Sequence, residues 1–348
     1  MKRNMMIVKL MGKALVLCLL SSCSVIDEDL DACGTSYELD YELRLVTNMT
    51  TELETQLTTQ TDITLSNSLR THLSNIFSDF AHDVDLSFYD TQGDSTRLQH
   101  DEHIMNANQA SYTLYLPMRQ YMHLAAANVV NNELVTVTND KLCHKAMLSQ
   151  AKNDTIDSHS TGLFTARQAM EVLEGVDQTF NVHLYMANCA ATLFIDPKAH
   201  VTAAPIQVYS TGFATGFNIC DSVFQYSAQP PIVRTTRMTS DETNAQLFCS
   251  VTFPSKEISA ATTRTVIDTE EPFISGSDAN ALWEFHVYVP QTDGTTTKTI
   301  LYVKEPLRAG QLKIIKCWLD DSGAVMTQSP EVSTSVTLNW KEGLEIEN

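Results

Sequence analysis

Basic residues are scarce in this sequence of 348 residues. Lysine and arginine together number 23, aspartate and glutamate number 42, and the formal net charge is −19. A surface with this excess of negative charge repels the phosphate backbone of DNA and RNA, as well as anionic lipid headgroups. We therefore expect no nucleic-acid partner.

The sequence also lacks the short motifs that carry common enzyme chemistry. No HExxH, GxSxG, P-loop or GxGxxG pattern occurs, and no cysteine pair has CxxC spacing. The best local cluster for a metal is His100-Asp101-Glu102-His103. It has no third ligand nearby, and we interpret it as a polar surface loop. We expect no catalytic residue, no metal site, no cofactor and no enzymatic activity.

Long apolar runs are missing except at the start of the chain. Four basic residues flank and precede the apolar segment 14–20, which is too short to span the roughly 30 Å hydrocarbon core of a bilayer. Small residues then lead to Cys23, and Leu20-Ser21-Ser22-Cys23 has the pattern of a bacterial lipobox. We expect cleavage between Ser22 and Cys23 and acylation of the Cys23 thiol, with an ordinary secretory signal as the alternative.

An acidic tether is expected directly after the lipid. Loss of residues 1–22, which hold four basic and no acidic residues, takes the net charge from −19 to −23. The run Asp27-Glu28-Asp29 would then lie at the membrane surface. Charge alone leaves two interpretations open, a label for surface sorting or a solvated tether.

Beyond residue 36 the chain mostly alternates between apolar and polar residues, as half-buried strands do. In the segment 37–45 the tyrosines and leucines share one face and the charged residues share the other, which predicts a strand. In the segment 65–80 the apolar spacings of four, four, three, one and three predict an amphipathic helix. Many short strands with one helix predict a mainly-β protein of two β-sandwich domains.

Asp196-Pro197 interrupts the strand pattern, and we place a domain boundary there. Two local interpretations accompany this division. The polar segment 140–162 is expected to be a loop that carries Cys143, and the segment 300–319 is expected to form a hairpin around Arg308-Ala309-Gly310. The predicted organisation is a signal peptide at 1–22, the tether at 23–36, an N-terminal domain with the helix at 37–197 and a C-terminal domain at 198–348.

The last predicted strand ends close to the C-terminus. It is alternating and rich in β-branched residues, so it suits donation to the sheet of another subunit, although it can equally close the sheet of its own domain. Trp340, like Trp283, lies on the inward phase of its strand, which favours core packing over sugar binding. The residues on the inward face are Val332, Thr334, Val336, Leu338 and Trp340.

Six cysteines remain after Cys18 is removed with the signal and Cys23 is acylated. An exported protein permits disulfides, and six thiols allow 15 pairings, among which the sequence does not choose. A boundary near residue 197 leaves an odd number on each side, so some thiols stay free or a bridge crosses between domains. These cysteines are Cys33, Cys143, Cys189, Cys220, Cys249 and Cys317.

The two ends of the chain resemble one known family. Cys23 followed by Ser-Val-Ile-Asp-Glu-Asp-Leu, then Cys33 and Tyr37-Glu38-Leu39-Asp40-Tyr41, is similar to the start of the FimB-like fimbrial anchor lipoproteins of Bacteroidales, minor subunits of type V pili. The segment 335–340 resembles the final strand of that family. Between the ends, the likeness is one of organisation.

The resemblance implies two tandem transthyretin-like β-sandwich domains that anchor a fimbrium and limit its length. Shaft pilins of this kind lose their first strand to an arginine-specific protease and receive a neighbour's C-terminal strand, whereas anchors keep both lipid and first strand. Arg44 lies inside the first strand and no arginine occurs in 23–37, which fits retention, although a cut further downstream stays open. The family also implies that Asp27, Glu28 and Asp29 signal surface display.

We therefore expect a lipid-anchored subunit exposed on the outer membrane. Its expected partners are fimbrial pilin subunits and, through the lipid on Cys23, the membrane itself. The alternative function is a surface lipoprotein that binds glycans for a nutrient-uptake system, which exposed aromatic platforms would favour. A third class, a lipid-anchored hydrolase, would need a carboxylate or metal constellation that the sequence does not show.

Overall fold

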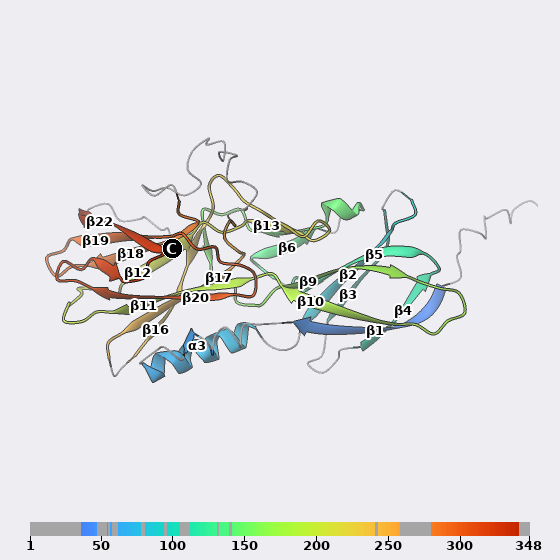
Figure 1. Cartoon of the computed structure of the whole chain (residues 1–348), viewed down its shortest axis with the longest axis horizontal. Coiled ribbons are helices and arrows are strands. Elements are labelled where there is room, and N and C mark those ends of the chain that lie inside the picture. The colour runs from blue at the N-terminus through green and yellow to red at the C-terminus, as the bar shows by residue number, and fades with distance from the viewer. Residues whose placement is uncertain are drawn as a thin grey trace, which may run out of the picture.

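The computed structural model shows an elongated, mainly-β molecule whose two lobes lie end to end (Figure 1). The first strands form one lobe, and the last strands form the other. Among the described residues, no helix has the length and apolar character needed to cross a membrane. The described residues are 36–46, 54, 56–57, 62–77, 81–93, 96–104, 111–130, 132–138, 141–240, 243–257 and 280–340.

A seven-stranded sheet forms most of the first lobe, in the order β3-β2-β5-β9-β10-β1-β4. It curls over on itself, because side chains of β1 and β5 meet although β9 and β10 lie between these strands. The buried residues Leu39, Leu86 and Val182 belong to the core enclosed by this curl. The strands are β1 (Ser36–Val46), β2 (Asp83–Asp90), β3 (Arg97–Ile104), β4 (Ser111–Pro117), β5 (Gln120–Ala127), β9 (Phe164–Glu171) and β10 (Thr179–Met186).

A smaller four-stranded sheet, in the order β14-β13-β7-β6, covers part of the seven-stranded sheet. Leu124 of β5, Leu148 of β7 and Phe217 of β13 belong to one buried cluster between the two. The elements are β6 (Val135–Thr138), the short 3₁₀ helix η1 (Cys143–Lys145), β7 (Met147–Gln150), β13 (Gly216–Asn218) and β14 (Val223–Gln225).

The second lobe is a sandwich of two sheets, with the orders β22-β19-β18-β12-β15-β8 and β16-β17-β11-β20-β21. Leu193, Phe248 and Trp283 lie in the core between them, so Trp283 is a core residue as predicted. The strands are β8 (Thr155–Asp157), β11 (Cys189–Asp196), β12 (Gln207–Thr211), β15 (Ile232–Arg234), β16 (Thr236–Thr239), β17 (Gln246–Thr252), β18 (Trp283–Pro290), β19 (Thr296–Val303), β20 (Leu312–Leu319), β21 (Val325–Thr327) and β22 (Val332–Trp340).

The predicted amphipathic helix is present as α3 (Ile63–Ile76). Asp62 caps its N-terminus, because its Oδ1 accepts a hydrogen bond from the Leu65 amide at 2.9 Å. The apolar stripe joins the buried cluster that holds Leu247 and Val251 of β17. Although α3 comes from the N-terminal half of the sequence, it therefore covers the outer face of the five-stranded sheet in the second lobe. The stripe consists of Leu65, Leu69, Leu73 and Ile76.

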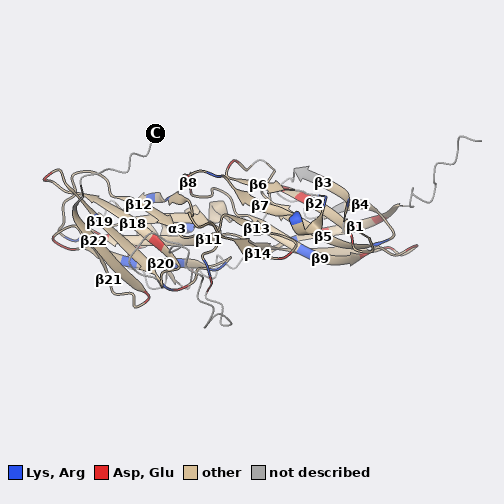
Figure 2. Ribbon diagram, turned by 90° about the horizontal axis from the view of Figure 1, so that it is seen from above, with Lys and Arg blue, Asp and Glu red and all other residues tan. Residues whose placement is uncertain are grey.

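Segments from the two halves of the sequence interleave around the predicted boundary at residue 197. In the first lobe, β7 pairs with β13 in antiparallel fashion, and in the second lobe β8 pairs with β15 in parallel. Figure 2 shows β13 and β14 beside β7, and β8 on the side of β12. The limits 37–197 and 198–348 remain a prediction, but strands from each of these two ranges pair with strands from the other.

Two local interpretations of the sequence were wrong. The segment 140–162 is not a loop, since it holds η1, β7 and β8, whose strands are too short to show a periodic pattern. The segment 300–319 is not a hairpin, because β19 and β20 belong to opposite sheets of the sandwich. Both strands bury apolar side chains, Leu301 and Ile315 among them, and that pattern suits a crossover between sheets as well as a hairpin.

Candidate functional site

The first strand, β1, lies inside the seven-stranded sheet with a partner on each side. It pairs in parallel with β10, where Leu43 faces Val182, and in antiparallel fashion with β4, where Leu39 faces Leu114. Its backbone hydrogen-bonding groups are therefore directed at neighbours along both edges. Removal of β1 would leave a slot between β10 and β4.

The predicted alternation of β1 is confirmed. Leu39, Tyr41 and Leu43 are 1%, 0% and 6% exposed, whereas Asp40 and Arg44 point to solvent. Burial of each large apolar side chain contributes on the order of 1.5–3 kcal/mol to stability. The first strand is thus a structural part of the core.

A buried polar contact fixes the centre of β1. The Nδ1 atom of His123 lies 3.0 Å from the carbonyl oxygen of Ser87, to which it donates a proton, so its Nε2 accepts from the Tyr41 hydroxyl at 2.5 Å. Burial lowers the pKa of His123 to about 4, which keeps the imidazole neutral at pH 7. The ring also stacks on Phe88, with centroids 4.3 Å apart. No spacing in the sequence indicated this contact.

The last strand, β22, occupies the end of its sheet. Among the described strands it has one ladder, in which Val332 faces Val303 and Val336 faces Thr299 of β19. The register shifts between Thr296 and Lys298, which marks a bulge or irregularity near the end of the pair. At the other edge of β22, none of the described strands forms a ladder.

The apolar row of β22 leaves the core as the strand proceeds. Val332 is half-buried and packs against the core of the second lobe, but Val336 is 40% exposed and Leu338 is 53% exposed. Thr334 is exposed as well, and the side chain of Trp340 lies outside the described part of the chain. An edge strand with solvent-exposed apolar side chains near its end has the features of a strand that pairs with another subunit.

The structure does not describe the residues that are expected to be lipidated or to direct sorting. Ser22, Cys23, Asp27, Glu28 and Asp29 all lie outside the described residues. Their roles stay predictions.

The cluster at residues 100–103 is not a loop, as its sequence was interpreted, because it lies within β3 and pairs with β2. Positions three apart in a strand fall on opposite faces, so this spacing does not direct two ligands to one metal. The Nε2 atom of His100 instead lies 2.8 Å from Asp85 Oδ2. The described residues contain no group of three or more histidine, cysteine or acidic side chains arranged to hold a metal.

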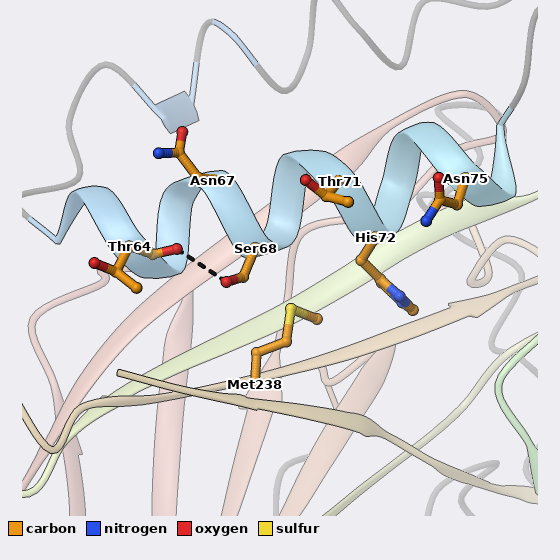
Figure 3. Close-up of a pocket in the computed structure, with 7 residues that line it drawn as sticks. All are labelled: Thr64, Asn67, Ser68, Thr71, His72, Asn75 and Met238. Carbon is orange, nitrogen blue, oxygen red and sulfur yellow. Dashed lines mark hydrogen bonds between the residues drawn. The ribbon is translucent and has the colours of Figure 1, made fainter. Parts of the chain in front are cut away.

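An open groove runs between α3 and the edge strand β16, and Figure 3 shows the residues that line it. His72 is its only titratable side chain, and burial lowers the pKa of that residue. The Nε2 atom of His72 is buried without a hydrogen-bond partner. A single histidine without a second acid, base or nucleophile does not make a catalytic constellation. The lining residues are Thr64, Asn67, Ser68, Thr71, His72, Asn75 and Met238.

A buried acid lies on β18, on the face of the six-stranded sheet that points away from the sandwich core. Glu284 is fully buried, neither carboxylate oxygen accepts a hydrogen bond, and Oε1 lies 3.5 Å from His286 Nε2. An ionised carboxylate in this setting costs stability, because its lost hydration is poorly replaced.

Two tyrosines expose their rings on strands that flank β1. Tyr115 is 55% exposed and Tyr185 is 60% exposed. They face Glu38 and Val46, at opposite ends of β1. They therefore do not form one shared aromatic platform, which is the feature that would favour a glycan-binding function.

No protein-family profile and no curated protein matches the sequence. Solved structures do match the fold. An adhesin candidate from Bacteroides thetaiotaomicron has a TM-score of 0.52 and 8% identity, covering 88% of this chain and 98% of its own. An adhesin candidate from Bacteroides ovatus has a TM-score of 0.52 and 11% identity, covering 89% and 97%.

A third similar structure is the fimbrial anchor protein Mfa2 from Porphyromonas gingivalis, with a TM-score of 0.46 and 9% identity over 88% of this chain and 98% of its own. At such identities the likeness concerns the fold. The two Bacteroides structures therefore show that this chain shares their fold.

Proposed function

We propose that this chain is a lipid-anchored surface subunit that holds a fimbrium, a type V pilus, at the outer membrane through strand pairing and limits the length of the fibre. The observation that carries the proposal is the contrast between its end strands. β1 is buried and paired on both edges, whereas β22 pairs with only one of the described strands and exposes Val336 and Leu338.

A retained first strand supports the anchor role over the role of a shaft pilin. Arg44 is exposed, with its nearest ion-pair partner Glu42 at 3.9 Å, but its backbone belongs to a strand paired with β10. A protease needs an extended, accessible backbone, and the ladder withholds it. Since β1 stays in place, its slot is closed to a donor strand, and a chain that only donates ends the polymer.

The last strand supports the link to the next subunit. Main-chain hydrogen bonds to the edge of β22 that faces away from β19 would supply much of the affinity, and its alternating side chains would set the register. The partner would be a pilin whose own sheet edge pairs with β22 and whose apolar surface admits Val336 and Leu338.

The link to the membrane rests on the lipobox. Acylation of Cys23 with two or more chains would give stable attachment, which one chain does not. The segment 23–36 would then connect the lipid to the start of β1, which lies at the end of the molecule opposite to β22 (Figure 1).

The test compares the native protein with Cys23→Ala in the source bacterium, and Cys33→Ala serves as the matched control. Fimbrial polymer is quantified in the cell-free medium and on the cells, and export of each variant is verified by immunoblotting of cell fractions. We expect shed and lengthened polymer for Cys23→Ala alone. Fimbriae that stay attached at normal length in an exported Cys23→Ala strain would refute the anchor, and a glycan-binding screen would then address the alternative function.

A further inference from the structure

Two cysteines that are distant in sequence meet at the edge of the four-stranded sheet. Cys143 begins η1 and is buried, and Cys220 follows β13 and is half-exposed. Their Sγ atoms lie 2.6 Å apart. Even smaller carbon atoms prefer non-bonded separations of about 3.5–4.0 Å, while bonded sulfurs lie about 2.05 Å apart. The two thiols are therefore closer than non-bonded packing favours.

Neighbouring hydrogen bonds hold both cysteines in this position. The Asn218 side chain donates to the His144 carbonyl oxygen at 2.7 Å and accepts from the Asp221 amide at 2.8 Å. The Ile219 amide donates to the Ala146 carbonyl oxygen at 3.0 Å. The two segments are thus fixed on both sides of the sulfur pair, independently of any bond between the sulfurs.

The other described cysteines have no such neighbour. Cys189 and Cys249 lie on adjacent strands but in different buried clusters, on opposite faces of the five-stranded sheet. The Cys189 thiol donates to the Phe253 carbonyl oxygen at 3.4 Å, and Cys317 is buried in the core of the second lobe. Among the described residues, one pair alone is poised to react.

We propose that Cys143 and Cys220 form a disulfide in the exported protein. The inference rests on the export signal expected at residues 1–22 and on this geometry, and it is independent of the fimbrial role. The oxidant required is a disulfide, carried by a thiol–disulfide oxidoreductase of the cell envelope.

The exchange proceeds in two balanced steps. The half-exposed Cys220, as its thiolate, attacks one sulfur of the oxidant, forms a mixed disulfide and releases the first thiol of the oxidant. Cys143 then loses its proton and attacks the Cys220 sulfur, which releases the second thiol. Burial, together with the adjacent Cys220, raises the pKa of the Cys143 thiol, so Cys143 is the resolving residue and not the first nucleophile.

The bridge joins parts of the fold that come from different halves of the chain. Cys143 precedes β7, and Cys220 follows β13, and these strands pair with each other. A covalent link here closes a long loop in the unfolded chain, which reduces its entropy, and it locks β6–β7 onto β13–β14. We therefore assign Cys143–Cys220 as the staple that holds the interleaved halves together.

Peptide mapping of the full-length exported protein tests the bond directly. Cells are lysed in excess alkylating agent, and the protein is digested with trypsin without reduction. The expected product is the segment 142–145, which holds Cys143, linked to 199–234, which holds Cys220. Recovery of both cysteines in alkylated form would overturn the proposal.

Thermal unfolding tests the consequence. Cys143→Ala, Cys220→Ala and the double variant should lower the midpoint by a similar amount, about 5 °C or more, without additivity. Reductant should lower the midpoint of the native protein by a comparable amount and leave these variants unchanged. Cys249→Ala, the matched buried control, should keep the response to reductant. A native protein insensitive to reductant would contradict the proposed bond.

Discussion

The first and last strands of this protein share a sequence pattern and differ in structure. β1 and β22 both alternate apolar and polar residues, yet Tyr41 is fully buried while Val336 is 40% exposed. The difference comes from position in the sheet, since β1 has a neighbour on both edges and β22 lies at an end. Alternation therefore specifies a strand with one apolar face, and the rest of the fold decides whether that face is covered.

The largest effect is expected from truncating the centre of β1. Tyr41→Ala removes a buried ring and leaves His123 Nε2 without its hydrogen-bond donor, so the free energy of unfolding should fall by about 3–5 kcal/mol. Urea unfolding followed by tryptophan fluorescence measures this change. Val336→Ala is the matched control on β22, and an equal loss there would erase the contrast between the two strands.

The buried contact between Tyr41 and His123 should also make the stability of the protein depend on pH. His123 has a folded pKa of about 4, so below about pH 6.5 the unfolded chain takes up a proton that the folded protein excludes. Stability should fall as the pH falls from about 6.5 to about 4, by about 2–3 kcal/mol for this histidine at pH 4.5.

His159, whose pKa burial also lowers to about 4, adds a similar loss. His123→Gln should therefore remove roughly half of the combined effect of the two histidines, measured by urea unfolding at pH 7 and pH 4.5. Tyr41→Phe keeps His123 buried and should retain the acid loss. An unchanged acid response in His123→Gln would show that the imidazole is not held neutral.

A smaller effect of opposite sign is expected in the sheet that carries β22. Glu284→Gln removes a buried charge whose oxygens accept no hydrogen bond, so the free energy of unfolding at pH 7 should rise by about 1 kcal/mol. Glu331→Gln, on a half-buried residue just before β22, serves as the control. Destabilisation by Glu284→Gln would mean that the attraction between Glu284 and Lys298 outweighs the cost of burying the carboxylate.

The smallest effect on stability should accompany the largest effect on assembly. The double variant Val336→Lys with Leu338→Lys should change the free energy of unfolding by about 0.5 kcal/mol or less, because both side chains are already exposed. Co-purification with the fimbrial polymer should nevertheless be lost. Unchanged co-purification of a folded variant would remove β22 from the interface.

Periodicity in the sequence was enough to predict the elements that have one clearly apolar face. β1 and the stripe of α3 follow from the spacing of their leucines, and β18 follows from Trp283, Phe285 and Val287.

The rest depends on partners that are distant in the chain. β8, β13, β14 and β15 span three residues each and exist because a neighbouring strand completes their hydrogen bonds. β3 is mostly polar and has no apolar face that marks a strand, so its residues 100–103 were interpreted as a loop. The contact of Tyr41 with His123 and that of Cys143 with Cys220 join residues 82 and 77 positions apart, and no local pattern encodes such pairs.

The lengthwise course of β1 has a mechanical consequence. The strand runs along the long axis of the molecule and begins toward its outer end, while β22 lies at the opposite end (Figure 1). A pull between the ends loads β1 in shear, so the hydrogen bonds to β10 and β4 share the force at once instead of breaking one by one. β7 and β8 follow each other in the chain but belong to different lobes. Their pairing with β13 and β15 would therefore transmit the force from one lobe to the other. The molecule should therefore resist tension along its long axis.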